Sequence, residues 1–440
     1  MPEHFVLRII LHQVMKIVLV NYRYFFAGGP ERYMFNIKQL LEDVGHEIIP
    51  FSVQNSKNVE TSYSKYFLSP IGSGDDVYFS DIIKGKKSLS DQWKGLTRMI
   101  YSYEAKKKFK KLLIDTKPDL IYMLYFQNKI SCSVVQAAYE LGIPVVQRIS
   151  DYSLLCPCSI YFRQNDCQIC ELCTEKTKLY AVKNKCVYNS SLYSFIKALA
   201  IDVQNIVGVR KKIKRFIFPS SYTMSKFIEN GFEKNKCVHV PTLFNGTALR
   251  TDLTIEYRPF ALFIGRTDPD KGLMTLLDAF IGTDFNLKII GFSSVAGYYE
   301  KLQDYVKGKK HNVEFLGRME FNQMQEYLAS CLFTVVPSEW YDNLPNTILE
   351  SYAMKKCVVA TRVGSLTENV CDGETGLLFN YKDAIDLRDK ISYLFNNPYK
   401  AKEFGKNAVH LINTKYSITK HIDSLIHVFK EVVNAESNNK

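Results

Sequence analysis

The sequence has no apolar run approaching the ~20 residues that a membrane-spanning helix requires. Residues 5–11 are apolar but too few, and no small-residue cleavage pattern follows them, so no signal peptide is expected. The chain has eleven cysteines without any export signal. This combination indicates a reducing compartment, the cytoplasm, where cysteines remain thiols or bind metal rather than form disulfides.

Two further patterns are missing or incomplete. The turn at Gly28 and Gly29 follows the first expected strand, residues 17–20, but the rest of the dinucleotide fingerprint is absent, which argues against a nicotinamide cofactor. The basic runs at 106–111 and 210–215 lack the interleaved aromatic residues of a base-stacking surface, so nucleic-acid binding ranks last among the functions considered. The net charge of +12 still suits a phosphate-rich ligand or an anionic membrane face.

What the sequence does contain is a strand–loop–helix–strand unit in residues 331–379. Residues 332–336 are expected to form a buried strand, and a polar loop follows it. Asn346 is expected to cap a helix that starts at Thr347, and residues 358–360 form the next buried strand. Such a unit is typical of a doubly wound α/β sheet, where ligands bind beyond the carboxyl ends of the strands.

Two carboxylates in this unit indicate a sugar ligand. Asp342 lies in the loop just before the helix and Glu350 one turn inside it, with seven residues between them. A carboxylate can accept two hydroxyl hydrogen bonds from a vicinal diol, while free backbone N–H groups at the helix start bind phosphate. The alternative is an ordinary acidic first turn that the helix dipole stabilises.

A second strand-to-helix turn carries two cations. Residues 260–264 form an apolar strand, Gly265 and Arg266 follow it, and Lys271 precedes a helical pattern that starts at Leu273. The planar fork of Arg266 and the point charge of Lys271 both suit a diphosphate. A solvated basic turn is the other interpretation, and the acidic loop downstream argues against it.

The segments GRTDPDKG, DNLPNTILE and MKKCVVATRVG together resemble the carboxyl-terminal signature of the retaining glycosyltransferases of family 4. The resemblance extends over nearly the whole chain from Met15 and is strongest in residues 260–380. Two residues depart from the family pattern: Asp342 stands in place of a longer glutamate, and Lys356 replaces a glycine. Neither departure removes a functional group that the chemistry requires.

The resemblance implies an α/β fold with two Rossmann-like domains that face a central cleft, the type-B arrangement. Residues 15–245 would form the amino-terminal, acceptor-binding domain, with a cysteine-rich insertion at 156–186. Residues 258–411 would form the nucleotide-sugar-binding domain. A helix in residues 412–440 would cross back onto the amino-terminal domain.

The resemblance also implies roles within the cleft. Arg266 and Lys271 would neutralise the charge that develops on the departing diphosphate, which is electrostatic stabilisation of the transition state. Glu350 would bind the ribose, and Asp342 would hold the donor sugar. The other positions expected in the donor site surround these side chains: Gly28, Gly29, Gly265, Arg318, Asn343 and Leu344. No acidic pair has the spacing of a metal site, so we expect no catalytic divalent ion.

The acceptor side of the cleft departs from the family. The chain has SDYSLLCP where the family commonly has a His-Asp pair, and the family's cleft histidine is absent from YMLYFQN. Retaining transfer in the family proceeds as a same-face displacement without a strong protein base, so the loss concerns substrate orientation more than catalysis. Asp151 either orients an acceptor hydroxyl or caps the following turn, and the sequence leaves both open.

Six cysteines lie within residues 156–186 and include a Cys-x₂-Cys pair at Cys167 and Cys170. Four thiolates form a closed tetrahedral zinc site, and some relatives in the family resemble this chain here. The predicted zinc ligands are Cys156, Cys167, Cys170 and Cys186, with a structural role. Reduced, unpaired thiols are the alternative.

These features predict an enzyme that moves a sugar from a nucleotide-diphosphate sugar to a glycan or a lipid-linked acceptor, with retention at the anomeric carbon. Enzymes of this type commonly build bacterial surface polysaccharides, which are assembled on lipid carriers. The two basic runs fall in the amino-terminal domain and either hold a cytoplasmic protein on the inner face of the membrane or are ordinary solvated surfaces. A protein that keeps the nucleotide-sugar cleft without turnover is the alternative function, and intact Arg266, Lys271 and Glu350 argue against it.

Overall fold

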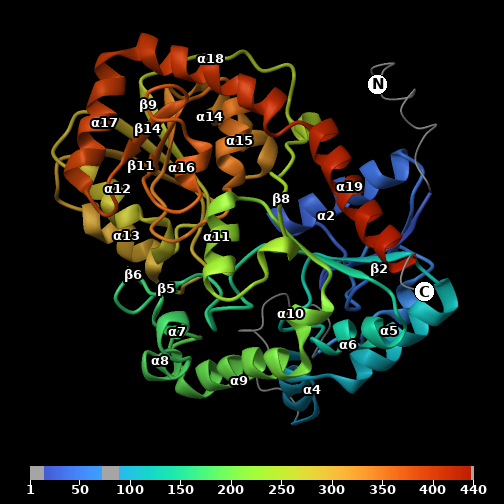
Figure 1. Cartoon of the computed structure of the whole chain (residues 1–440). Helices are drawn as coiled ribbons and strands as arrows, with labels where there is room; N and C mark the ends of the chain where they lie inside the picture. Colours follow the sequence, from blue (N-terminus) through green and yellow to red (C-terminus); the bar gives the residue numbers. More distant parts are fainter. Residues whose placement is uncertain (1–13, 72–88, 438–440) are drawn as a thin grey trace.

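Short apolar runs of the chain form two six-stranded sheets, one in each of two lobes, in the computed structural model, which describes residues 14–71 and 89–437. Figure 1 shows the amino-terminal lobe in blue to green and the carboxyl-terminal lobe in yellow to orange. Helices cover both sheets, so the chain has the expected α/β architecture of two Rossmann-like sheets. The apolar segment 5–11 lies outside the described residues.

The first sheet belongs to the amino-terminal lobe, and all its strand pairs are parallel. Its strands, in spatial order, are β2 (Glu47–Phe51), β1 (Lys16–Val20), β3 (Leu120–Met123), β4 (Val145–Arg148), β7 (Arg215–Phe218) and β8 (Cys237–His239). Successive side chains of a strand alternate between the two faces of the sheet. Ile17 and Leu19 of β1 therefore pack in one core, and Val18 and Val20 pack in the other. An uninterrupted apolar run is what a strand buried on both faces requires.

The second sheet is also parallel throughout. Its strands, in spatial order, are β11 (Asn312–Gly317), β10 (Asn286–Ile290), β9 (Phe260–Ile264), β12 (Phe333–Val336), β13 (Val358–Thr361) and β14 (Gly376–Phe379). Along the chain, the sheet first extends from β9 to β10 and β11 on one side, and then from β12 to β13 and β14 on the other. The order therefore reverses between β9 and β12, and the loops that leave these strands diverge and open a crevice at their carboxyl ends.

Helices lie on both faces of each sheet. In the amino-terminal lobe they are α2 (Gly29–Asp43), α4 (Leu89–Ile100), α5 (Tyr103–Thr116), α6 (Ser133–Glu140), α7 (Leu172–Glu175), α8 (Leu179–Lys183), α9 (Ser191–Val207), α10 (Val209–Lys212) and α11 (Ser221–Glu229). In the carboxyl-terminal lobe they are α12 (Leu273–Phe280), α13 (Tyr298–Val306), α14 (Phe321–Ser330), α15 (Asn346–Ala353), α16 (Leu366–Asn369), α17 (Ala384–Asn396) and α18 (Pro398–Thr414).

The last helix, α19 (Ile418–Ser437), returns to the amino-terminal lobe and lies near α2 (Figure 1). Its apolar face, which includes Leu425 and Phe429, shares one core with Ile17 and Leu19 of β1. His421 is buried there, where Nδ1 lies 2.6 Å from the carbonyl oxygen of Pro241. Burial lowers the pKa of His421 to about 4, so its ring is neutral near pH 7. The expected crossover is therefore present as an integral part of the amino-terminal core.

Some local features differ from the sequence-based expectations or add to them. The basic run at 106–111 lies in α5, which begins at Tyr103 because the hydroxyl of Ser102 accepts a hydrogen bond from the N–H of Ala105 at 3.2 Å and caps the helix. Helix α15 includes Asn346, and Pro345 rather than Asn346 occupies the cap position. Strand β14 and the short hairpin of β5 (Phe162–Arg163) and β6 (Gln168–Ile169) were not expected.

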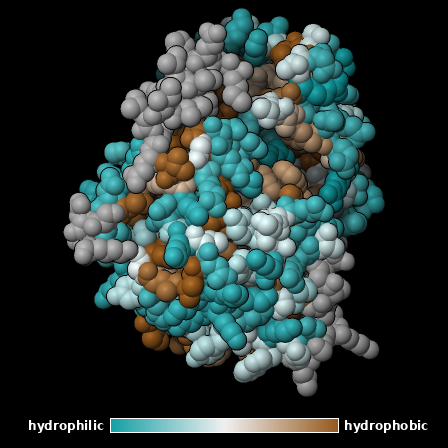
Figure 2. Space-filling model, turned by 90° about the vertical axis from the view of Figure 1, so that its right-hand side faces the viewer, coloured by the Kyte–Doolittle hydropathy of each residue, from teal (hydrophilic) through white to brown (hydrophobic). Residues whose placement is uncertain are grey.

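The molecular surface is largely hydrophilic on the face that Figure 2 shows, where apolar residues occur in separate patches. The apolar side chains are concentrated instead in the cores around the two sheets. Among the helices of residues 14–71 and 89–437, none has both the length and the apolar character needed to cross a bilayer.

Candidate functional site

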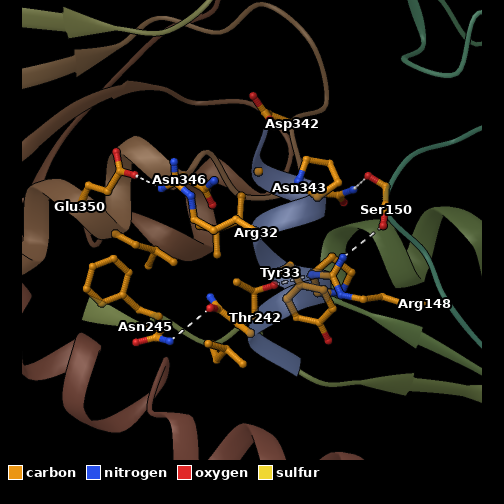
Figure 3. Close-up of a pocket in the computed structure, with 18 of the residues that line it drawn as sticks. Arg32, Tyr33, Arg148, Ser150, Thr242, Asn245, Asp342, Asn343, Asn346 and Glu350 are labelled. Carbon is orange, nitrogen blue, oxygen red and sulfur yellow. Dashed lines mark hydrogen bonds and ion pairs between the residues drawn. The ribbon is translucent and has the colours of Figure 1, made fainter. Parts of the chain in front are cut away.

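A cavity of about 270 Å³ lies between the lobes and is lined by both of them. We call it the interlobe cavity. The amino-terminal lobe contributes Gly29, Pro30, Arg32, Tyr33, Asn36, Arg148, Ser150, Pro219, Thr242, Leu243, Phe244 and Asn245. The carboxyl-terminal lobe contributes Trp340, Asp342, Asn343, Leu344, Asn346, Leu349 and Glu350. Figure 3 shows many of these polar side chains pointing toward one another across the cavity.

The structure brings Lys271 and Asp342 together at the crevice between β9 and β12. Lys271 Nζ donates a hydrogen bond to Asp342 Oδ2 at 2.5 Å, and Asp342 is buried. The same Nζ lies 5.0 Å from the ring centre of Trp340. The side chains that were expected to bind diphosphate and donor sugar are therefore neighbours, although they come from loops 71 residues apart.

Gly272 allows this approach. Its φ is +69°, and a Cβ there would lie only 1.9 Å from the carbonyl oxygen of Pro337, which follows β12. Only glycine satisfies both the left-handed conformation and the close contact. The turn that carries Lys271, residues 269–271, therefore packs closely against the carboxyl end of β12.

We expect Gly272→Ala to destabilise the protein more than Gly308→Ala. Both glycines are left-handed, with φ of +69° and +74°, but nothing lies within 4 Å of a Cβ on Gly308. Left-handed strain costs about 1–2 kcal/mol in either variant, and overpacking adds about 1–3 kcal/mol at Gly272 alone. Urea unfolding followed by circular dichroism measures the difference. Equal unfolding midpoints for the two variants would contradict the close packing at Pro337.

Arg266 stands at the edge of this crevice and is held by two buried carboxylates. Its guanidinium pairs with Asp268, and Nη2 lies 3.4 Å from Asp270 Oδ2. Burial raises the pKa of Asp268, but the charge of Arg266 and hydrogen bonds from Ser294 and Ser293 outweigh it and lower that pKa overall. These two aspartates, which were not predicted as site residues, hold the guanidinium in place. Arg266 itself does not line the interlobe cavity.

Glu350 faces the cavity from the first turns of α15 and pairs with Arg32 of α2. Its Oε1 lies 3.1 Å from Arg32 Nη1, and the carboxylate side chain is only 8% exposed. Burial raises the pKa of Glu350, and the Arg32 charge acts in the opposite direction. The Arg32 guanidinium also lies 4.8 Å from the ring centre of Phe321. Arg32 is therefore a site residue that the sequence argument missed.

Two asparagines of the carboxyl-terminal lobe contact the amino-terminal lobe directly. Asn343 Nδ2 donates to the carbonyl oxygen of Ser150 at 2.7 Å, and Asn343 Oδ1 accepts from the hydroxyl of Thr223. A Cβ on Gly29 would lie 2.7 Å from Asn346 Nδ2. The start of α2 can approach the start of α15 closely because residue 29 has no side chain.

Asp151 does not line the interlobe cavity, whereas its neighbour Ser150 does. Asp151 Oδ1 accepts a hydrogen bond from the N–H of Ser153 at 2.8 Å. Burial raises the pKa of Asp151. Of the two roles that the sequence left open, this geometry is that of the turn cap.

Of the remaining predicted donor-site residues, some line the cavity and others do not. Leu344 and Gly29 line it, and Gly28 precedes α2 with an extended backbone. Gly265 lies against the residue that follows β10, because a Cβ on Gly291 would lie 1.8 Å from the carbonyl oxygen of Gly265. The guanidinium of Arg318 lies 5.1 Å from the ring centre of Phe292, outside the cavity lining.

The predicted zinc site is not assembled. Within residues 14–71 and 89–437, no group of three or more His, Cys, Asp or Glu side chains is arranged to hold a metal ion. Cys156 lies beside Cys158, with 3.3 Å between the sulfur atoms. Cys167 instead has φ of +51° in the β5–β6 turn, and its carbonyl oxygen accepts a hydrogen bond from Lys382. The Cys167 thiol donates to the carbonyl oxygen of Gln164, and the predicted set of Cys156, Cys167, Cys170 and Cys186 is not gathered into one group among the described residues.

Two parallel sheets whose carboxyl ends share one cleft, with cations and carboxylates from the loops after β9 and β12, define the type-B fold of glycosyltransferases. Residues 247–410 match the family model described as glycosyl transferases group 1. This match assigns the carboxyl-terminal lobe to that family.

Individual proteins show the same similarity. The chain is 33% identical over 210 residues to the uncharacterized glycosyltransferase MJ1178 of Methanocaldococcus jannaschii, an alignment that covers 48% of this chain and only 58% of that protein. It is 26% identical over 366 residues to an uncharacterized 42.6 kDa protein in the cps region of Klebsiella pneumoniae, covering 80% of this chain and 87% of that protein. The structure of HepE from Anabaena, in complex with UDP and glucose, shares the fold with a TM-score of 0.63 and 16% identity, covering 95% of this chain and 100% of that chain.

Proposed function

We propose that the protein transfers a sugar from a nucleotide-diphosphate sugar to a glycan or lipid-linked acceptor, with retention at the anomeric carbon. The observation that carries the proposal is the convergence of Lys271, Asp342 and Glu350 at the crevice where the strand order of the second sheet reverses. This is the position at which open α/β sheets bind nucleotides.

The side chains proposed to bind the donor form ion pairs with neighbouring side chains of the cleft. Lys271 pairs with Asp342, and Arg32 pairs with Glu350. A diphosphate offers Lys271 a second anion, sugar hydroxyls can donate to Asp342, and ribose hydroxyls can donate to Glu350. Donor binding would thus give Lys271 and Asp342 new partners, while Glu350 could keep its ion pair with Arg32 and accept from ribose with its other oxygen.

The leaving group is the part of the reaction that these cations assist. As the bond to the anomeric carbon breaks, negative charge develops on the diphosphate, and fixed positive charges at Lys271 and Arg266 stabilise it. The residues that line the described cavity include no histidine, which fits a same-face displacement in which the departing phosphate, rather than a protein base, receives the acceptor proton.

The comparisons support the substrate class. HepE was solved with UDP and glucose, which is consistent with a nucleotide-sugar donor for this fold. The Klebsiella relative is described as a protein in the cps region, which supports a role in building surface polysaccharide.

A panel of nucleotide sugars tests the proposal. We expect one donor to raise the thermal unfolding midpoint and to release its nucleoside diphosphate when an acceptor is present. Stabilisation without release of diphosphate under any acceptor condition would favour a binding protein without turnover. If no nucleotide sugar stabilises the protein, the donor-site assignment is wrong.

We also propose that the protein docks on anionic membrane, where lipid-linked acceptors are found. The basic runs at 106–111 and 210–215 pack on either side of α6. Several of their charges are already engaged, since Lys106 and Lys110 pair with Glu140 and Lys212 donates to Gln136. Lys107 and Lys211 remain exposed.

Sedimentation with phosphatidylglycerol vesicles should therefore retain the protein at low salt and release it at high salt. Each basic residue near an anionic surface contributes about 1 kcal/mol, so Lys107→Glu with Lys211→Glu should weaken retention strongly. The matched control is Lys309→Glu with Lys310→Glu, a pair of exposed lysines in the other lobe. Unmodified protein that stays in the supernatant at low salt would show that these runs are ordinary solvated surfaces.

A further inference from the structure

Arg148, at the carboxyl end of β4, lines the interlobe cavity and has no anionic partner there. Its Nη1 donates to the Ser150 hydroxyl at 3.2 Å, and Nη2 donates to the hydroxyl of Thr242. Its guanidinium carbon lies 4.0 Å from the ring centre of Tyr33. Among residues 14–71 and 89–437, no carboxylate forms an ion pair with Arg148, whereas Arg32 and Arg266 each have at least one.

The surroundings of Arg148 supply no compensating negative charge. Tyr33 and Tyr122 stay neutral because burial raises their pKa values, and the pKa of His421 lies near 4. The Nε of Arg148 is buried and has no hydrogen-bond partner. A guanidinium remains charged at all physiological pH values, and a partly desolvated charge without a counterion is unfavourable. A guanidinium in these surroundings is suited to bind an anion.

The position of Arg148 separates it from Glu350, the proposed ribose-binding residue, and leaves it near the proposed site of the donor sugar, because Asn343 and Arg148 both contact Ser150. In Figure 3, Glu350 and Arg148 lie at opposite ends of the cavity, with Arg32 and Tyr33 between them. The polar side chains that contact Arg148 through hydrogen bonds are the hydroxyls of Ser150 and Thr242, which suit sugar hydroxyls. The end that holds Arg148 is therefore the end away from the proposed ribose site.

We propose that the acceptor carries an anionic group, a carboxylate or a phosphate ester, that binds Arg148 close to the hydroxyl that receives the sugar. This inference rests on the proposed transferase function and specifies its acceptor. A guanidinium fork binds either group with two parallel hydrogen bonds. The two sources are an acidic sugar of the growing glycan and the phosphate that joins a sugar to its carrier.

Matched acceptor pairs test the proposal with the unmodified protein. Methyl glucuronoside against methyl glucoside isolates the carboxylate, and glucose 1-phosphate against glucose isolates the phosphate ester. With the donor identified by thermal stabilisation, we expect one anionic member to be used with kcat/KM about ten-fold or more above its neutral partner, about 1.4 kcal/mol. The pair that shows the preference identifies the source. Equal use of both members of both pairs would overturn the proposal.

Variants of Arg148 supply the second test. Arg148→Gln should remove the preference, mainly through KM for the anionic acceptor, while donor stabilisation and use of the neutral acceptor are retained. Arg148→Lys keeps the charge without the fork and should retain part of the preference. Arg258→Gln, at an exposed arginine paired with Glu256, is the control and should change nothing.

The outcomes separate this inference from the function on which it rests. A loss of activity toward both members of a pair in Arg148→Gln, with Arg148→Lys equally impaired, would show that Arg148 only supports the end of β4. Absence of donor binding in the unmodified protein would instead refute the transferase proposal. If Arg148→Gln fails to fold, the acceptor preference of the unmodified protein still decides the question.

Discussion

Glu350→Ala should lower kcat/KM by about 30- to 1,000-fold while the fold survives. Glu350 is a buried carboxylate that faces the interlobe cavity, and hydrogen bonds from ribose hydroxyls to a charged group in a closed cleft are worth about 2–4 kcal/mol. The substitution also leaves Arg32 without its carboxylate partner at 3.1 Å. Steady-state kinetics with the identified donor measure the loss.

Two companions make the Glu350 test specific. Glu350→Gln keeps the shape of the side chain but loses its charge and one acceptor oxygen, so its activity should fall between those of the unmodified protein and Glu350→Ala. Glu374→Ala, at an exposed residue before β14, should have normal kinetics. A near-normal kcat/KM for Glu350→Ala would remove Glu350 from the donor site.

Arg266→Ala should reduce kcat by a similar factor, again about 2–4 kcal/mol of transition-state stabilisation. Arg266 is held by Asp268 and Asp270, so its charge is positioned before substrate arrives and needs no reorganisation during the reaction. The loss should appear mainly in kcat, because the diphosphate gains negative charge only as it departs.

The control for Arg266→Ala is Arg258→Ala, which removes an exposed arginine from the same lobe. Surface ion pairs contribute about 0–1 kcal/mol, so this variant should behave like the unmodified protein. Arg266→Lys should recover part of the activity, because it restores the charge without the planar fork. An unchanged kcat in Arg266→Ala would mean that Arg266 does not stabilise the departing diphosphate and that Lys271 does so alone.

The strands and the two ligand-binding turns were predictable because their signals are local. Runs such as residues 260–264 and 358–360 are apolar throughout, which only a strand covered on both faces accommodates. The glycines and charged residues after these strands follow directly in the sequence, and parallel strands deliver their carboxyl ends to one edge. Lys271 and Asp342 could thus be placed in one crevice without knowledge of the packing.

Arg32 could not be predicted in the same way. It is 318 residues from Glu350 in the chain, and the two meet only because the lobes pack with α2 against the start of α15. A lone arginine on an amphipathic helix carries no periodic or spacing signal. Arg148 is similar, since its lack of an anionic partner is a property of the surroundings that the folded chain creates.

The structure does not gather the four predicted cysteines into one metal-binding group among the described residues, so zinc binding stays a prediction. A Cys-x₂-Cys spacing indicates a metal knuckle when the intervening turn directs both thiols to one side. Here the turn belongs to a hairpin in which Cys167 adopts φ of +51°, and its thiol donates to the nearby carbonyl oxygen of Gln164. Spacing in the sequence therefore did not determine the direction of the side chains.

The return of α19 has a consequence for how the cleft can move. The chain passes between the lobes twice, once after β8 and once between α18 and α19. The two connections lie side by side, since the N–H of Phe244 donates to the carbonyl oxygen of Tyr416 at 2.8 Å, which favours rotation of the lobes about one hinge. A fragment that ends after β8 would also leave the Ile17 and Leu19 face of the first sheet uncovered, because α19 completes that core. We therefore expect such a fragment to expose apolar surface and to aggregate.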